Sequence, residues 1–143
     1  MNYNFYGWET CDLLPVNEAY SAVKTPRDLY DLLKRVWSIE TCAPRLRPAW
    51  SRENPTLGQC SITSYLVQDI YGGKVYGVPL AEGGFHCFNV VGDCMFDLTS
   101  EQFNGRKLAY GKEYEQFREA HFSDEDKYAR YLLLKQGLVD AIK

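Results

Sequence analysis

The first strong hydrophobic periodicity in the chain lies shortly after residue 25. Apolar side chains recur there at spacings of three and four, at Leu29, Leu32, Leu33, Val36 and Trp37. Thr25 can cap a helix that begins at Pro26, and Asp28 suits the positive end of the helix dipole. The pattern therefore predicts an amphipathic helix over about residues 26–38, with one buried face.

A second helix is predicted at Cys60–Tyr71, just after Gly58. Two glycines, Gly72-Gly73, follow it and can supply the positive φ with which many helices end. The segment between the two helices, residues 41–55, contains three prolines. Because proline interrupts helices, we expect a connector there, with a short helix near residues 49–53.

Beyond these glycines the hydrophobic pattern changes to an alternation of period two, which is typical of strands. We expect strands at residues 74–78, 85–91 and 94–98, with Gly92-Asp93 as a two-residue hairpin turn between the last two. A turn of this kind sets the register of the hairpin. Phe88 should then face Asp97, and Val90 should face Met95.

The C-terminal third contains weaker signals. Residues 106–110 are predicted as a further strand, and Ser123 as the cap of a helix over 124–136 that can resume after Gly137. The whole pattern predicts an α+β fold, with N-terminal helices, the Cys60 helix packed on an antiparallel sheet of roughly three to five strands, and a C-terminal helix. We expect a single domain over residues 1–143, with the core of the candidate site in residues 50–105.

Charge and composition exclude several classes of function. The chain has 16 Lys and Arg against 19 Asp and Glu, a net charge of -3, so no general attraction to nucleic acid or to anionic membranes is expected. Its apolar runs are far shorter than the roughly 20 residues of a membrane-spanning helix. Residues 1–8 lack the features of a secretory signal. The five cysteines include no CxxC pair, which favours a reducing compartment, the cytoplasm.

Cys60 occupies a position that favours a reactive thiol. In the first turn of a helix, free amides and the helix dipole stabilise negative charge, so the pKa of a thiol can fall well below its reference value of about 8.5. A thiolate there can attack a carbonyl carbon. The Cys60 amide and a side-chain amide, from Gln59 or Asn54, would then hold the developing oxyanion.

His86 is the better of two candidate bases. The other histidine, His121, lies in a charged amphipathic segment where an exposed surface position is expected. In the predicted hairpin, His86 and Asp97 are diagonal neighbours on one face, within reach of each other's side chains. This placement predicts Cys60 as nucleophile, His86 as general base and then acid, and Asp97 as the group that orients the imidazole.

Each of these residues also has a structural interpretation. A free Cys often packs as a small hydrophobe, a strand His can bond to backbone, and Asp97 can cap the turn that follows it. The three residues are also acceptable zinc ligands, but their spacing matches no common zinc motif, so no metal is predicted. We interpret the other thiols as structural, at Cys11, Cys42, Cys87 and Cys94.

The order of nucleophile, base and carboxylate resembles the Cys-His-Asp arrangement of the papain-like superfamily, which includes transglutaminase-like and NlpC/P60-like enzymes. More narrowly, the chain resembles the YunG-like bacterial family over about residues 37–105. The motifs that carry this resemblance are Trp50-Ser51, the run from Asn54 to Thr63, Val67-Gln68-Asp69, Gly72-Gly73, His86, Asn89, and Asp97-Leu98-Thr99 followed by Gln102-Phe103. The resemblance implies a papain-like fold and points to Trp50, Asn54 and Asn89 as substrate contacts.

Some positions depart from the better known papain-like enzymes. Papain-type proteases place a Gln six residues before the nucleophile, but Asn54 stands there and Gln59 directly precedes Cys60. Ser61 replaces the aromatic of the papain signature, and Asp97 stands where NlpC/P60 enzymes commonly use a second His. We therefore expect a cysteine-dependent hydrolase or acyltransferase that acts on an amide or thioester of a small molecule or peptide, without a cofactor. The alternative is a non-catalytic binding module that kept the cleft.

Overall fold

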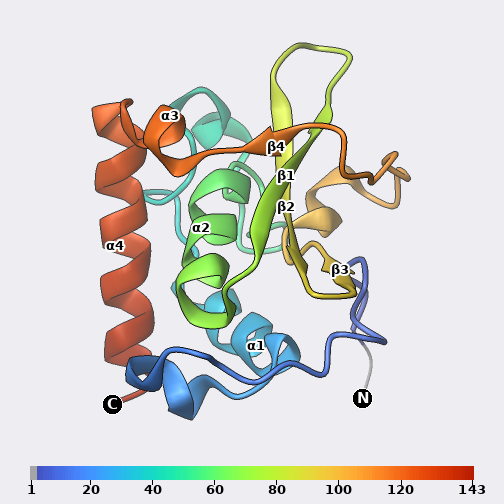
Figure 1. Ribbon diagram of the computed structural model, residues 1–143. Coiled ribbons are helices and arrows are strands. Elements are labelled where there is room, and N and C mark those ends of the chain that lie inside the picture. Colours follow the sequence, from blue (N-terminus) through green and yellow to red (C-terminus); the bar gives the residue numbers. More distant parts are fainter. Residues whose placement is uncertain (1–2) are drawn as a thin grey trace.

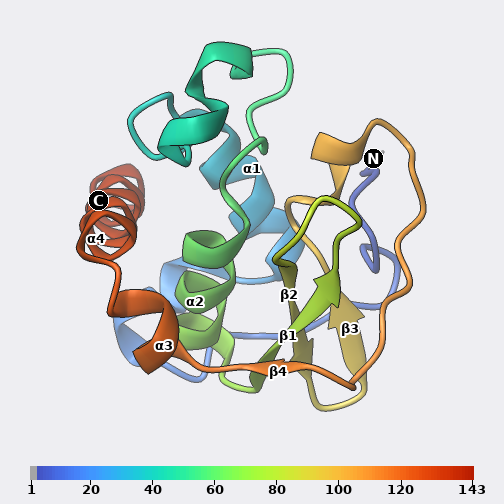
Figure 2. The same ribbon diagram turned by 90° about the horizontal axis from the view of Figure 1, so that it is seen from above.

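Helix α2 (Cys60–Tyr71) lies at the centre of the structure, between a sheet on one side and helix α4 (Glu125–Ala141) on the other (Figures 1 and 2). The computed structural model describes residues 3–143. Eight of the twelve residues of α2 are buried, including the polar Thr63 and Ser64. A helix at the surface of a domain would keep one polar face exposed to solvent. Because α2 is covered on two sides, most of its surface is buried, polar positions included.

The sheet is antiparallel and has the strand order β3-β2-β1-β4. Its strands are β1 (Lys74–Pro79), β2 (Phe85–Val91), β3 (Cys94–Phe96) and β4 (Glu115–Gln116). One face packs on α2. The other face buries a small apolar cluster of Val78, Phe88 and Val90, which the segment before β4 covers with Leu108 and Tyr110 (Figure 2). This arrangement confirms the predicted α+β class with an antiparallel sheet.

The predicted β2–β3 hairpin and its register are confirmed where the two strands pair. Val90 pairs with Met95, Asn89 with Phe96, and the turn is Gly92-Asp93. β3 ends at Phe96, however, so the prediction of a strand to residue 98 was wrong and Phe88 does not pair with Asp97. The chain turns at Asp97, whose carbonyl accepts from the Ser100 amide at 3.3 Å, and the Asp97 amide donates to the Tyr6 carbonyl of the N-terminal segment at 2.9 Å.

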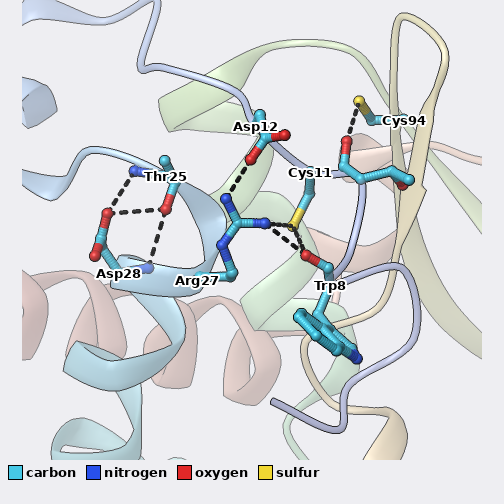
Figure 3. Close-up of polar contacts among 8 residues, drawn as sticks. Trp8, Cys11, Asp12, Thr25, Arg27, Asp28 and Cys94 are labelled. Carbon is cyan, nitrogen blue, oxygen red and sulfur yellow. Dashed lines mark hydrogen bonds and ion pairs between the residues drawn. The ribbon is translucent and has the colours of Figure 1, made fainter. Parts of the chain in front are cut away.

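The predicted helix at 26–38 is helix α1 (Pro26–Val36), which ends two residues earlier than expected. Its capping box is formed as the sequence indicates: the Asp28 amide donates to the Thr25 hydroxyl, and the Thr25 amide donates to the Asp28 carboxylate (Figure 3). The short connector helix was misplaced. It is the 3-10 helix η2 (Pro44–Ala49) and not residues 49–53, because the fixed φ of Pro44 begins it.

Arg27 and Cys94 hold the N-terminal segment against the rest of the fold. The Arg27 guanidinium donates to the Trp8 carbonyl at 2.6 Å and pairs with the Asp12 carboxylate (Figure 3). On the other side, the Cys94 thiol of β3 donates to the Thr10 carbonyl at 3.2 Å. The segment is thus fastened to both α1 and the edge of the sheet. The chain then forms the 3-10 helix η1 (Glu18–Val23) before α1.

The C-terminal part corrects three predictions. Residues 106–110 are irregular, and the extra strand is β4, which follows them. After β4 come the short helix α3 (Arg118–Phe122) and then α4, whose N-cap is Asp124 and not Ser123. Gly137 does not interrupt α4. A Cβ atom there would lie 2.5 Å from Val36 of α1, so the missing side chain lets the two helices approach closely.

Two further features complete the fold. After β3 the chain turns through the 3-10 helix η3 (Ser100–Phe103). Among residues 3–143, we find no helix with the length and apolar character needed to cross a membrane.

The loop before α2 is pinned through Gly58, which precedes Gln59 and Cys60. Gly58 has a φ of +75°, and its carbonyl accepts from the Ala43 amide at 3.0 Å. A Cβ atom at this position would lie 2.6 Å from the Cys42 sulfur and 2.9 Å from the Ala43 nitrogen. Only glycine satisfies both the positive φ and this close approach.

We expect Gly58→Ala to destabilise the protein by more than the roughly 1–2 kcal/mol of left-handed strain alone, because it adds a clash with backbone. The matched control is Gly105→Ala. Its φ of +86° is similar, but nothing lies within 4 Å of the added Cβ, so it tests strain without the clash. Denaturant unfolding of both variants measures the difference. Equal losses of stability in the two variants would show that the contact with Cys42 and Ala43 is unimportant.

Candidate active site

The structure brings Cys60, His86 and Asp97 to one place from three elements. Cys60 is the first residue of α2, His86 is the second residue of β2, and Asp97 directly follows β3. Cys60 and His86 both line a cavity of about 890 Å³, and Cys60 is partly exposed to it. The side chains of His86 and Asp97 are each only 1% exposed. The Cys60 thiol at the cavity therefore lies in front of a buried polar pair.

His86 is held by Asp97. The distance between His86 Nε2 and Asp97 Oδ2 is 2.6 Å, and the ring of Phe103 packs edge-on against the imidazole with 4.7 Å between centroids. Because Nε2 is occupied by the carboxylate, Nδ1 is the ring nitrogen that remains for an interaction with Cys60, and His86 and Cys60 each stabilise the charged form of the other.

Asp97 has both of the roles that the sequence left as alternatives. Its Oδ1 accepts from the amide and the hydroxyl of Thr99, at 3.0 and 3.2 Å, and so caps the turn after β3. Its Oδ2 accepts from His86 and from the Tyr110 hydroxyl at 2.7 Å. Each carboxylate oxygen therefore has its own partners: Oδ1 caps the turn, and this orients Oδ2 toward His86.

Tyr110 is a site residue that the sequence did not indicate. Its ring stacks on that of Tyr6 with 3.8 Å between centroids, and its hydroxyl donates to Asp97. Burial and the neighbouring carboxylate raise the pKa of Tyr110, which keeps the phenol protonated as a donor. No spacing rule finds such a residue, because an irregular segment carries it across the outer face of the sheet.

The charges of the site favour a thiolate beside an imidazolium. A hydrogen bond from the Cys87 thiol lowers the pKa of Cys60 well below its usual value, burial opposes this, and hydrogen bonding and charge attraction from His86 lower the pKa further. Burial disfavours a charged His86, but Asp97 and Cys60 outweigh burial and raise the pKa of His86 to about 10. Each group thus stabilises the charged form of the other.

Ser61, Cys87 and His121 form a second polar group near Cys60, which the sequence did not indicate either. Ser61 Oγ is 3.9 Å from the sulfur of Cys60 and 3.8 Å from the sulfur of Cys87. Cys87 Sγ is in turn 3.9 Å from His121 Nε2, and burial together with Lys127 lowers the pKa of His121. His121 lines the cavity, so the expected exposed surface position was wrong. The cause is tertiary, since β4 and α3 carry His121 across to α2.

The remaining predicted residues lie elsewhere. Gln59 is fully buried and its amide donates to the Ser38 carbonyl at 3.1 Å. Asn89 is 2% exposed and its amide donates to the Ser64 carbonyl of α2 at 2.9 Å, so it fastens the helix to the sheet. The Trp50 indole donates to the Pro55 carbonyl at 3.1 Å. Within the described chain, none of Trp50, Asn54, Gln59 and Asn89 lines the cavity of Cys60 and His86.

The cavity wall carries charges of both signs. Its basic side chains are Arg45, Lys127 and Arg130, and its acidic ones are Glu82, Asp124 and Asp126. Among residues 3–143, no group of three or more His, Cys, Asp or Glu side chains is arranged to hold a metal ion. The cavity volume falls in the range of about 300–1,000 Å³ that is usual for small-molecule sites.

Comparison with known proteins places the chain in a family. No solved structure matches it significantly. The Uncharacterized protein YunG of Bacillus subtilis (strain 168) is 33% identical over 72 residues, which are 50% of this chain and 57% of that relative, so the match spans a little over half of the relative's length. The family model described as YunG protein matches residues 25–143, a region that includes Cys60, His86, Asp97 and His121. The chain therefore belongs to the YunG family.

Proposed function

We propose that this protein is a cysteine-dependent hydrolase or acyltransferase with a papain-like Cys-His-Asp site, in which Cys60 attacks the carbonyl carbon of an amide or thioester. One observation carries the proposal. Cys60 lies at the start of a helix and beside a cavity that His86 also lines, and the buried carboxylate of Asp97 is 2.6 Å from the imidazole of His86. A structural thiol does not need this chain of partners.

The papain-like assignment of the fold rests on the order and placement of these elements. The helix that begins with the nucleophile packs on an antiparallel sheet, the sheet carries the base, and the carboxylate follows in the next strand connection. This is the arrangement that the sequence resemblance implies. The function itself is inferred from the site and not from the fold, because one fold can host many activities.

The first half-reaction starts from the ion pair. The Cys60 thiolate forms a C–S bond to the carbonyl carbon, and the carbonyl oxygen becomes an oxyanion. When the oxyanion collapses, the bond from carbon to the leaving nitrogen or sulfur breaks, and His86 gives its Nδ1 proton to the leaving group. The product is a thioester on Cys60 with neutral His86, whose ring Asp97 keeps in place through Nε2.

The second half-reaction regenerates the thiolate. Neutral His86 takes a proton from water, or from an acceptor amine or thiol, as that group attacks the thioester carbon. The C–S bond then breaks, Cys60 leaves as a thiolate, and His86 is again an imidazolium. Water as the acceptor gives hydrolysis, and an amine or thiol gives acyl transfer.

Backbone amides of α2 are the best donors to the oxyanion. The first amides of a helix have no partner within it, and the amide of Thr63 makes the first such bond of α2, to the Gln59 carbonyl at 3.1 Å. The amides of Cys60 and Ser61 precede it, and both residues line the cavity. The Gln59 side chain is engaged by Ser38, so we assign this role to the helix amides.

The pKa values of the two histidines should be shifted in opposite directions from the ordinary value, upward for His86 and downward for His121. The chain contains two His residues, so both imidazoles can be followed by NMR. We expect His86 to stay protonated at pH 8 and to lose its proton near pH 10, whereas His121 should be neutral at pH 7. Because the folded pKa of His86 is raised, its stabilising contribution is full below about pH 6.5 and is lost as the pH rises to about 10.

In Asp97→Asn the pKa of His86 should fall from about 10, since only the Cys60 thiolate then opposes the effect of burial. The matched control is Thr99→Val, which removes one donor to Asp97 but keeps the carboxylate and should leave His86 protonated at pH 8. Titration of His86 near pH 6.5 in the native protein would contradict the ion pair.

Acylation of Cys60 is the direct test of the proposed activity. The native protein treated with p-nitrophenyl acetate, or with an acetyl thioester, should gain one acetyl group on Cys60 and then turn over. His86→Ala should slow the acylation by about 10²–10⁴-fold. Iodoacetamide at pH 6 should label Cys60 selectively, and this labelling should fall by about two orders of magnitude in His86→Ala.

Cys94 provides the control for thiol reactivity. It is partly exposed, and burial raises its pKa, so it should label slowly at pH 6, and Cys94→Ala should leave acylation unchanged. A Cys60 that labels no faster than Cys94 and gains no acetyl group would rule out the proposed enzyme. The cavity would then be tested for ligand binding, as a non-catalytic module requires.

A further inference from the structure

Cys87 is a second thiol near the proposed nucleophile, and the two share the Ser61 hydroxyl as a neighbour. It lies on β2, next to His86 in sequence, but its side chain is on the opposite face of the strand, toward α2. Its side chain is fully buried, and its sulfur and that of Cys60 each lie within 4 Å of the Ser61 hydroxyl. In the acylation scheme Cys87 forms no covalent bond and transfers no proton; it only helps to stabilise the Cys60 thiolate.

The two thiols differ in charge and in access. Hydrogen bonding between the two thiols lowers the pKa of Cys60 and, together with burial, raises the pKa of Cys87. Cys60 lines the cavity, whereas Cys87 is shielded from it. Small reagents that enter the cavity therefore meet a thiolate first, and a protonated thiol lies behind it.

We propose that Cys60 and Cys87 form a dithiol that hydroperoxides oxidise to a reversible intramolecular disulfide, with Cys60 as the reacting and Cys87 as the resolving cysteine. The inference deepens the proposed function, since it rests on the same activated Cys60 and makes that site sensitive to oxidation. The ligand of the site in this role is a small hydroperoxide, such as hydrogen peroxide.

The first step consumes one peroxide. The Cys60 thiolate attacks one peroxide oxygen, the O–O bond breaks, and the leaving oxygen takes a proton from His86, which gives Cys60 sulfenic acid and water or an alcohol. The sulfur of Cys60 is oxidised by two electrons and the peroxide is reduced by two. His86 ends as the neutral imidazole, and Asp97 still binds its Nε2.

The second step closes the disulfide. The Cys87 sulfur attacks the sulfenic sulfur, the S–O bond breaks, and the proton of the Cys87 thiol leaves with the hydroxyl as water. His86, now neutral, can relay this proton across Cys60. The balance over both steps is two thiols and one hydroperoxide giving one disulfide, water, and a second water or an alcohol. Closure brings the sulfurs to about 2.05 Å.

His121 and its neighbours favour attack by Cys87. The charged amine of Lys127 donates to His121 Nδ1 at 2.9 Å, so the remaining proton is on Nε2, which donates to Gln116 Oε1 at 3.0 Å. The Cys87 sulfur is 3.9 Å from the same nitrogen, whose N–H can be shared between Gln116 and a developing Cys87 thiolate. A donor on that side stabilises negative charge as the Cys87 proton departs. The oxidation scheme thus assigns a role to His121, Lys127 and Gln116, which have none in the acylation scheme.

The experiment compares reduced and peroxide-treated full-length protein. One equivalent of hydrogen peroxide should yield a Cys60–Cys87 linked peptide in non-reducing peptide mapping. Cys60 should lose both its labelling by iodoacetamide at pH 6 and its acetylation by p-nitrophenyl acetate. Dithiothreitol should restore both. The disulfide would thereby protect the nucleophile from irreversible oxidation.

Cys87→Ala separates resolution from simple oxidation. In this variant a second equivalent of hydrogen peroxide should oxidise the Cys60 sulfenic acid to sulfinic acid, which dithiothreitol does not reduce, whereas native protein given two equivalents should recover its labelling. The matched control is Cys94→Ala, which should behave like the native protein because Cys94 lies at the far edge of the sheet and bonds to Thr10. Thermal unfolding checks that both variants are folded. If Cys87→Ala does not fold, Ser61→Ala and His121→Gln should slow disulfide formation with both thiols still present.

The outcomes distinguish this inference from the proposed function. Absence of the linked peptide, with Cys60 still acetylated in the reduced protein, overturns the inference and leaves the acyl chemistry intact. Recovery of Cys87→Ala by dithiothreitol to the native extent also overturns it. A linked peptide in a protein that cannot be acetylated supports the dithiol and overturns the acyl chemistry.

Discussion

The buried pair of His86 and Asp97 is the interaction on which the rest of the site depends. Two charged groups that are each 1% exposed lose their hydration, and only close, complementary partners offset that loss. Removing one partner from such a pair costs about 3–5 kcal/mol, because the other charge is left alone. Thr99 and Tyr110 donate further hydrogen bonds to Asp97, so that both oxygens of its carboxylate have partners.

Several contacts between distant parts of the chain hold this pair and Cys60 in place. The N-terminal segment pairs with Asp97 through Tyr6 and stacks the Tyr6 ring on Tyr110. Arg27 fastens the same segment to α1. On the other side, Asn89 fastens α2 to β2, so that Cys60 is held near the strand that carries His86. Elements distant in sequence thus converge on one imidazole.

The parts of the site that sequence reasoning predicted are those that local rules control. Thr25, Pro26 and Asp28 specify a helix start, and the paired glycines after Tyr71 end α2. The Gly92-Asp93 turn sets the hairpin register, which brings His86 and Asp97 to one face. The cap expected at Ser123 was wrong by one residue, because the adjacent Asp124 is an equally suitable cap. The other errors lie where no short-range rule acts: the strand expected at 106–110, and the side-chain roles of Gln59 and Asn89, which make structural hydrogen bonds.

The sequence by itself determined most of the helices and strands and the candidate trio of Cys60, His86 and Asp97, because helix caps, strand alternation and turn chemistry depend on neighbours a few residues away. Only the tertiary structure decided which groups surround that trio. Tyr110 reaches Asp97 from an irregular segment, and His121 and Cys87 meet beside Cys60 from α3 and β2. Such contacts join residues far apart in the chain, and they follow from how the layers pack, which no local pattern encodes.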